Sequence, residues 1–121
     1  MKAVIDSDIL IDYLQGREAA RVELGRYDRA LYSVISWMEV LCGAKTTAAQ
    51  KSAETLFASL QRVDLSLEIA QKAVAERRKT GLKLPDAISL ATADHAGCIL
   101  VTRNTKDFDP TDPRVRIPYS I

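Results

Sequence analysis

Acidic and amide side chains recur where predicted strands give way to predicted helices. They are Asp6, Glu39, Asp86, Asn104 and Asp107. Carboxylates that lie close together repel one another and raise one another's pKa values, so such a group is usually stabilised by a cation. Oxygen ligands without cysteine or histidine select Mg²⁺ or Mn²⁺. Such an ion activates a bound water and neutralises charge on a phosphate, which favours phosphodiester hydrolysis.

Each acid also has a purely structural interpretation. Asp6 can cap the N-terminus of the first helix. Ser36 and Glu39 match a capping box. In this interpretation Glu39 lies in the first turn of a helix and only accepts a hydrogen bond from the Ser36 backbone. Asp86 can complement the positive end of a helix dipole. Taken together, these structural interpretations are less convincing, because residues that only cap separate helices have no reason to gather at one edge of one sheet.

The elements that must position these residues follow from hydrophobic periodicity. Apolar and β-rich runs predict strands over residues 4–5, 31–35, 63–65, 98–101 and 115–117. Helices are expected over 9–14, 17–26, 37–43 and 53–60, from about 69 to the stop at Gly81, and from Pro85 to Gly97. This alternation predicts an α/β fold with a central parallel sheet of four to five strands and helices on both faces. The acids are then expected at the carboxyl ends of the strands.

Composition narrows the class of protein. The chain has 121 residues, 47% hydrophobic and 27% charged, as in an ordinary soluble domain. Its formal charge of +1 excludes a histone-like basic coat, so any nucleic-acid contact must come from local patches. No stretch approaches the ~20 apolar residues of a membrane span, which predicts a cytoplasmic protein. Cys42 and Cys98 lie in apolar runs without metal-ligand spacing, so we expect two buried thiols and no zinc site.

Four motifs, in order, resemble those of PIN-domain nucleases. They are VIDSD at 4–8, SWMEVLCG at 36–43, LPDAISLA at 84–91 and LVTRNTKDF at 100–108. Their spacing is similar to that of the short bacterial toxin branch, the VapC-type ribonucleases. Any one motif is weak evidence, whereas four in order in a chain of this length are specific.

The resemblance implies a PIN-like three-layer fold in one domain, residues 1–121. It also implies an endoribonuclease that depends on Mg²⁺ (or Mn²⁺ as a substitute), cleaves structured RNA such as tRNA, and is the toxin of a toxin–antitoxin pair. Asp6 and Asp86 match the family's principal metal ligands, and Glu39 matches its third acid. Asn104 completes the implied catalytic set, where family members often carry Asp. Whether Asn104 or Asp107 fills that fourth position stays open, as does the number of metal ions.

Other polar residues have supporting roles in this interpretation. Ser7 and Thr102 are candidate hydrogen-bond donors to the carboxylates. Three further acids are interpreted as surface groups or supports of the ligands, and not as ligands themselves. They are Asp8, Asp12 and Asp94.

Basic residues bracket the predicted acidic edge and predict contacts to an RNA backbone. They are Arg77, Arg78, Lys79, Lys83 and Arg103, with Lys106 beside Asn104. The group at 77–79 also suits the C-terminal end of a helix as plain solvated charge. The resemblance implies two protein partners, a small antitoxin that covers the active edge and a second copy of the chain in a homodimer. The apolar faces at 53–60 and around Tyr13 and Leu14 are either contact surfaces or ordinary core.

Three other functions stay open on the sequence. A phosphoacceptor receiver domain also gathers acids at strand ends, but it needs an acid that ends the central strand and a lysine after a later strand. Here Glu39 and Asp86 are expected inside helices, and no such lysine is evident. A PIN-like module that only binds is suggested by Asn104, which supplies no charge. A PIN nuclease outside toxin–antitoxin systems would carry the same residues.

Overall fold

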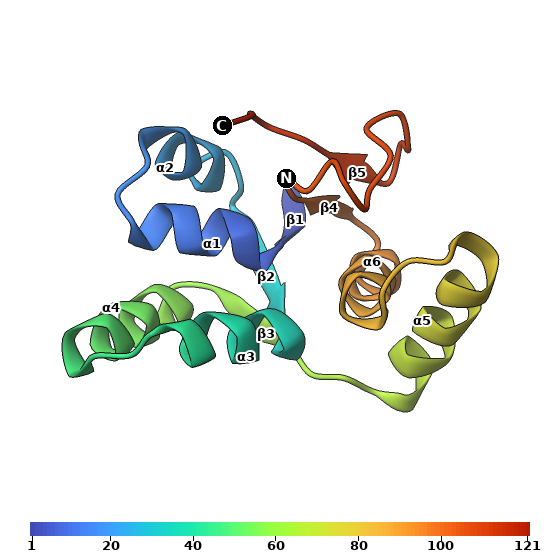
Figure 1. Ribbon diagram of the computed structural model, residues 1–121, viewed down its shortest axis with the longest axis horizontal. Coiled ribbons are helices and arrows are strands. Elements are labelled where there is room, and N and C mark those ends of the chain that lie inside the picture. The colour runs from blue at the N-terminus through green and yellow to red at the C-terminus, as the bar shows by residue number, and fades with distance from the viewer.

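The sheet at the centre of the molecule has five strands, all parallel, in the order β3-β2-β1-β4-β5 (Figure 1). The computed structural model describes residues 1–121. The strands are β1 (Lys2–Ile5), β2 (Arg29–Ser33), β3 (Gln61–Val63), β4 (Ile99–Val101) and β5 (Val115–Arg116). The helices are α1 (Ser7–Leu14), α2 (Glu18–Leu24), α3 (Val34–Gly43), α4 (Thr47–Ala58), α5 (Leu67–Thr80) and α6 (Leu84–Ala96). The predicted α/β fold with a parallel sheet is confirmed.

Helices cover both faces of the sheet, and the alternation of side chains along β1 shows which helices cover which face. Ala3 and Ile5 point into a hydrophobic core shared with α1 to α4, whereas Val4 points into a second core with α6. A third cluster, around Ile69 and Ile88, joins α5 to α6. Figure 1 shows the two groups of helices on opposite sides of the strands. None of the helices combines the length and the apolar character that a membrane span requires.

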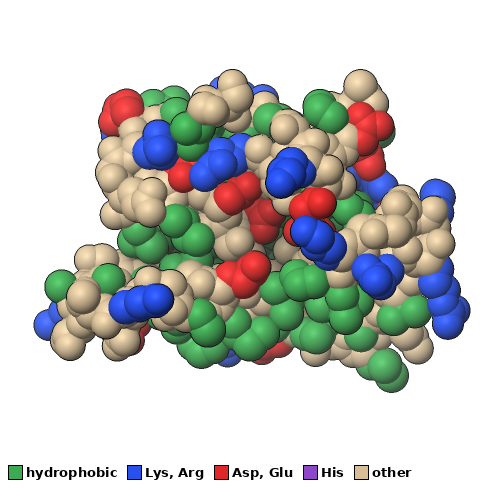
Figure 2. Space-filling model, viewed as in Figure 1, with side chains coloured by type: hydrophobic (Ala, Val, Ile, Leu, Met, Phe, Trp, Pro, Cys, Tyr) green, Lys and Arg blue, Asp and Glu red, His purple; other side chains and the backbone are tan.

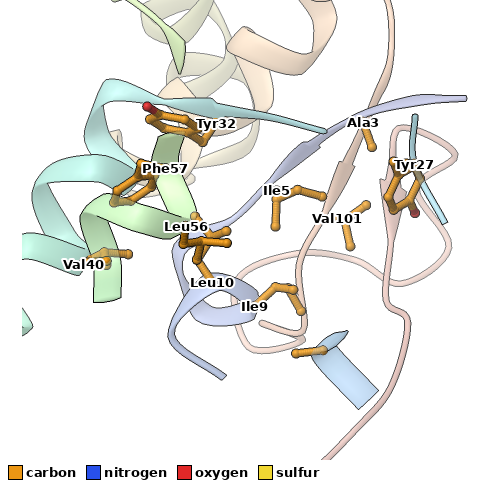
Figure 3. Packing of buried hydrophobic residues seen from close by; sticks show 12 residues of the cluster. Ala3, Ile5, Ile9, Leu10, Tyr27, Tyr32, Val40, Leu56, Phe57 and Val101 are labelled. Carbon is orange, nitrogen blue, oxygen red and sulfur yellow. The ribbon is translucent and has the colours of Figure 1, made fainter. Parts of the chain in front are cut away.

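The larger core holds the first helix against the first strand. Figure 3 shows Ile5, Ile9 and Leu10 packed together, and all three are fully buried. Beside them the rings of Tyr32 and Phe57 lie 4.5 Å apart between centroids and are tilted by 42°. Because both β1 and α1 are anchored in this core, the junction between them is fixed in place, and that junction is Asp6.

The second strand ends earlier than its sequence suggests. Val34 and Ile35 are β-branched and favour a strand by propensity. The side chain of Ser33, however, accepts a hydrogen bond of 3.1 Å from the backbone of Ser36, so helix α3 begins at Val34. The predicted capping box at Ser36 is therefore wrong. Glu39 is the sixth residue of α3, in its second turn, and its exposed side chain has no capping role.

Two smaller expectations also change. The strand expected over 63–65 is β3 at Gln61–Val63, and residues 64–66 form the loop to α5. The expectation of two buried thiols is wrong, because Cys42 is exposed and Cys98 is partly exposed; neither forms a disulfide. An apolar run on a helix buries only one of its faces, and Val40 occupies the buried face here.

Ser33→Ala is expected to destabilise the protein by about 1–2 kcal/mol, because it removes an N-cap and leaves a buried backbone N–H of α3 without a partner. Urea unfolding measures the change. Thr46→Ala is the matched control: Thr46 caps α4 in the same way, but its bond to Ala49 is exposed and water can replace it. An equal or larger loss for Thr46→Ala would contradict the assignment of Ser33 as the buried cap.

Candidate active site

An open hollow of about 490 Å³ lies at the carboxyl edge of the sheet. Figure 2 shows acidic side chains gathered in the middle of this face, with Lys and Arg side chains around them. The hollow is lined by Asp6, Ser7, Asp8, Glu39, Asp86, Arg103, Asn104, Thr105, Lys106, Ser120 and Ile121. All four residues of the predicted catalytic set therefore lie around one hollow, although they come from distant parts of the chain. The C-terminal segment forms part of the wall, which the sequence did not indicate.

Asp6 caps a helix and faces the hollow at the same time. It follows β1 directly, and its Oδ1 accepts a hydrogen bond of 2.9 Å from the backbone N–H of Ser7 at the start of α1. Its side chain is almost completely buried. Burial, followed by repulsion from Asp8 and Asp86, raises the pKa of Asp6 to about 7. The capping interpretation and the functional one are thus compatible, since one oxygen serves the helix.

Asp8 is a further acid of the site. Its Oδ2 accepts hydrogen bonds of 3.1 Å from the Thr102 hydroxyl and from the backbone N–H of Arg103, so it joins α1 to the loop after β4. Burial raises its pKa despite these bonds. Thr102 thus donates to a carboxylate, as expected, and Asp8 supports the site from the wall of the hollow. The sequence analysis interpreted Asp8 as a surface group or a support of the ligands, and its contacts fit the second of these roles.

Asp86 and Asp107 form a carboxylate pair. Burial, followed by the charge and the hydrogen bond of Asp107, raises the pKa of Asp86 to about 6. The Asn104 amide donates to Asp107 Oδ2 at 2.9 Å, and this bond, together with Lys83, lowers the pKa of Asp107. In the absence of a cation, Asp86 is therefore the member of the pair that takes up a proton first as the pH falls. Asn104 lines the hollow, while Asp107 is the acid that contacts Asp86; the role of either residue as the fourth catalytic group stays a prediction.

The four carboxylates that line the hollow lack a cationic partner. None of Asp6, Asp8, Glu39 and Asp86 forms an ion pair. The donor set of carboxylate and amide oxygens, without thiol or imidazole, fits a hard divalent cation such as Mg²⁺. In the present side-chain arrangement no three acidic, His or Cys side chains converge closely enough to hold an ion. The residues fit a metal by chemistry and by unbalanced charge, and side-chain rotation is needed to close ligands around it.

The basic residues divide into two groups. Arg103 and Lys106 line the hollow. Lys83 lies at its edge, with Nζ 3.9 Å from Asp107 Oδ2. The residues at 77–79 lie at the C-terminal end of α5 and do not line the hollow, and Arg77 donates to the carbonyl of Leu82 at 2.8 Å. Their contact with RNA stays a prediction.

Comparisons with known proteins identify the family. The PIN-domain family model matches residues 3–112. The chain therefore belongs to the PIN-domain family, as its four motifs indicated. No curated protein sequence matches closely enough to count as a relative.

Solved structures place the fold more narrowly. A chain of a toxin–antitoxin complex from Klebsiella pneumoniae is 41% identical, with a TM-score of 0.92 and coverage of 98% of this chain and 99% of that one. A chain of VapBC2 from Rickettsia felis, bound to a promoter DNA fragment, is 18% identical, with a TM-score of 0.79 and 96% coverage of each chain. A chain of FitAcB from Neisseria gonorrhoeae is 17% identical, with a TM-score of 0.73 and coverage of 98% and 99%. Within the PIN family, the chain has the fold of the VapC-type toxins.

Replacing Asp6 with Asn is expected to alter the pH dependence of stability in the metal-free protein. The pKa of Asp6 is raised from 3.8 to about 7, so between these values the folded state holds a proton that the unfolded state has released. The stability associated with this group is complete below pH 4 and is lost as the pH rises through 7. Asn keeps the N-cap but cannot ionise. The free energy of unfolding of Asp6→Asn should therefore rise relative to that of the wild type between pH 4 and pH 8, by on the order of a few kcal/mol.

Urea unfolding in EDTA at several pH values measures this difference. The difference between the two proteins is the readout, because carboxylates with lowered pKa values, such as Asp12 and Asp107, change stability in the opposite sense. Asp94→Asn, which replaces an exposed carboxylate of α6 that pairs with Lys72, is the control and should show no such gain over the wild type between pH 4 and pH 8. A constant difference between Asp6→Asn and the wild type would contradict a raised pKa for Asp6.

Proposed function

We propose that this chain, as a single domain over residues 1–121, is a Mg²⁺-dependent endoribonuclease and the toxin of a toxin–antitoxin pair. The observation that carries the proposal is the convergence of Asp6, Glu39 and Asp86, without ion-pair partners, around one hollow at the carboxyl edge of a PIN sheet. The 41% identical chain from a toxin–antitoxin complex supports the biological role. Structured RNA such as tRNA is the proposed substrate, and Mn²⁺ is the expected substitute ion.

Asp6 and Asp86 would hold the ion, which lowers the pKa of a bound water and neutralises charge on the scissile phosphate. Glu39 is exposed at the rim of the hollow, where its carboxylate can orient the attacking water and accept its proton. The water oxygen bonds to phosphorus while the bond from phosphorus to the leaving ribose oxygen breaks, and that oxygen takes a proton from solvent. Asn104 holds Asp107 beside Asp86 throughout.

RNA approaches a hollow whose floor is acidic and whose rim is basic. Lys106 is exposed and lines the hollow, and Lys83 is exposed beside it. The residues at 77–79 are exposed on α5. We propose that they contact RNA flanking the cleaved bond, by charge and not by base stacking, since aromatic residues make up only 6% of the chain.

The proposed partners are a small antitoxin and a second copy of the chain. The antitoxin is expected to cover the acidic hollow. Of the surfaces considered for protein contact, the 53–60 stripe is largely core, because Ala53, Leu56 and Phe57 are buried. Tyr13 is exposed, and with Leu14 it lines an open hollow between α1 and α4. We also propose a cytoplasmic location, where both the RNA and the partners are found.

Cleavage of a structured RNA pool, tRNA included, tests the function. The wild type should cleave with Mg²⁺ and stop on chelation. Asp86→Asn removes a proposed ligand, so its cleavage activity should fall by more than the roughly 10- to 100-fold that is typical when a residue supporting the ligands is replaced. Asp94→Asn lies two turns further along α6 and should cleave like the wild type. A folded, inactive wild type would favour the binding-module alternative, and equal cleavage by Asp86→Asn would contradict the proposed ligand.

Replacing the cations of α5 should weaken RNA binding without slowing the chemical step. For a variant with Arg77, Arg78 and Lys79 all changed to Gln, KM should rise and the slope of log affinity against log salt should fall by about two to three. The kcat should stay at the wild-type value, since these residues lie outside the hollow. An unchanged KM and salt slope would show that the three charges are only solvated.

A further inference from the structure

Asp12 is a buried carboxylate behind the wall of the hollow. It lies on α1 with only 1% of its surface exposed. Its oxygens accept hydrogen bonds from Arg103 Nε at 2.6 Å, Arg103 Nη2 at 3.0 Å and the Tyr119 hydroxyl at 2.7 Å. Burial alone would raise the pKa of Asp12, but these partners, with Arg17, outweigh it and hold the pKa below its usual value. The carboxylate therefore stays charged and fully bound.

Arg103 is held to α1 at two points. Its guanidinium binds Asp12 in a bidentate manner, and its backbone N–H donates to Asp8, one helical turn earlier. The neighbouring Thr102 hydroxyl binds the same Asp8 oxygen and accepts from the backbone N–H of Asn104 at 3.2 Å. The start of the loop after β4 is thus fixed to α1 by side-chain and backbone bonds together.

The Nε–Nη2 edge of the Arg103 guanidinium is already bound to Asp12, and the Asp12 carboxylate balances its charge, so the group is poorly placed to neutralise an RNA phosphate. This geometry differs from the RNA contact that the sequence suggested for Arg103. We propose that Arg103 is a positioning residue: its pairing with Asp12 holds residues 102–107 so that Asn104 and Asp107 stand against Asp86. The inference rests on the proposed nuclease function and assigns these two residues a role within that site.

The chain offers a matched control for the pair. Glu23 is a buried carboxylate on α2 that binds Arg116 at 2.7 and 3.1 Å and the Tyr27 hydroxyl at 2.6 Å. The cluster again joins a carboxylate to an arginine and a tyrosine, with Glu in place of Asp, and none of its members lines the hollow. The Arg116 backbone carbonyl accepts a hydrogen bond from the N–H of Thr102, but a side-chain change leaves that bond in place. Replacing the Arg116 side chain therefore reports the general cost of breaking a buried pair.

The first test compares Arg103→Lys with Arg116→Lys in Mg²⁺-dependent RNA cleavage. Lysine keeps the charge but cannot form the bidentate pair. If Arg103 positions the loop, Arg103→Lys lowers kcat by about 10- to 100-fold with KM and salt dependence unchanged, and Arg116→Lys keeps the wild-type kcat. A phosphate contact would give the reverse pattern: Arg103→Lys near wild type, and Arg103→Gln with a raised KM and a salt slope smaller by about one.

A second variant keeps the test decisive if Arg103→Lys does not fold. Asp12→Asn combined with Arg103→Gln leaves a neutral pair that avoids an unpaired buried charge. It should show the same loss of kcat as Arg103→Lys while remaining folded. Hydrogen exchange of the metal-free proteins supplies a readout independent of activity: protection of the Arg103 and Asn104 amides should fall in both variants and persist in Arg116→Lys.

The outcomes separate the two proposals. A wild type that cleaves no RNA overturns the proposed function, and hydrogen exchange then decides on its own whether the pair holds the loop. A wild type that cleaves, with Arg103→Lys at full kcat and full amide protection, overturns the positioning role alone. An equal loss of kcat in Arg116→Lys would also overturn it, because the effect would then follow from general stability.

Discussion

Negative charge concentrated at the carboxyl edge of a parallel sheet is the constraint to which the rest of the structure responds. Asp6 is buried and Asp86 half-buried, both lie beside further carboxylates, and their pKa values are raised to about 7 and about 6. Burying a charge without a partner is costly, so the chain alone leaves this group partly protonated near neutral pH. A divalent cation bound at the hollow would remove that cost, and ion binding would then be coupled to the stability of the fold.

Elsewhere the chain gives its buried carboxylates arginine partners. Arg103, Arg114 and Arg116, all late in the chain, bind acids on α1, α5 and α2. Such pairs add little net stability over apolar packing, but losing one partner is costly, so they specify where the C-terminal segment lies. The acids of the hollow are excluded from this pairing. The contrast separates two uses of carboxylate in one small domain, one that fixes the chain and one that is left available to a cation.

Most of the fold could be predicted because its signals are local and repeated. Helical spacing and the stops at Gly81 and Gly97 give α5 and α6, and both glycines adopt the left-handed conformation that ends these helices. The end of β2 could not be predicted, because β-branched residues continue past it and a single serine hydroxyl decides where the helix begins. Propensity and capping compete there, and the cap prevails in the folded chain.

The acids of the site were predictable because parallel strands bring their carboxyl ends together, whatever their separation in the sequence. The partners of those acids were not. Asp12, Arg103 and Tyr119 are up to 107 positions apart, and no periodicity links them. Likewise, the sequence left open whether Asn104 or Asp107 fills the fourth position, because the answer depends on which side chain contacts Asp86 across the loop. Spacing predicts which edge a residue reaches, and only packing decides its contacts.

Calorimetric titration of the metal-free protein with Mg²⁺ or Mn²⁺, in buffers of different ionisation enthalpy, tests the central claim most directly. If the ion binds the carboxylates of the hollow, binding at pH 6 must displace protons from Asp6 and Asp86, and the buffer dependence of the heat will report their release. At pH 8 the release should be much smaller, since both groups are then largely ionised. Binding without proton release at pH 6, or no binding at either pH, would contradict a cation site at the edge of this sheet.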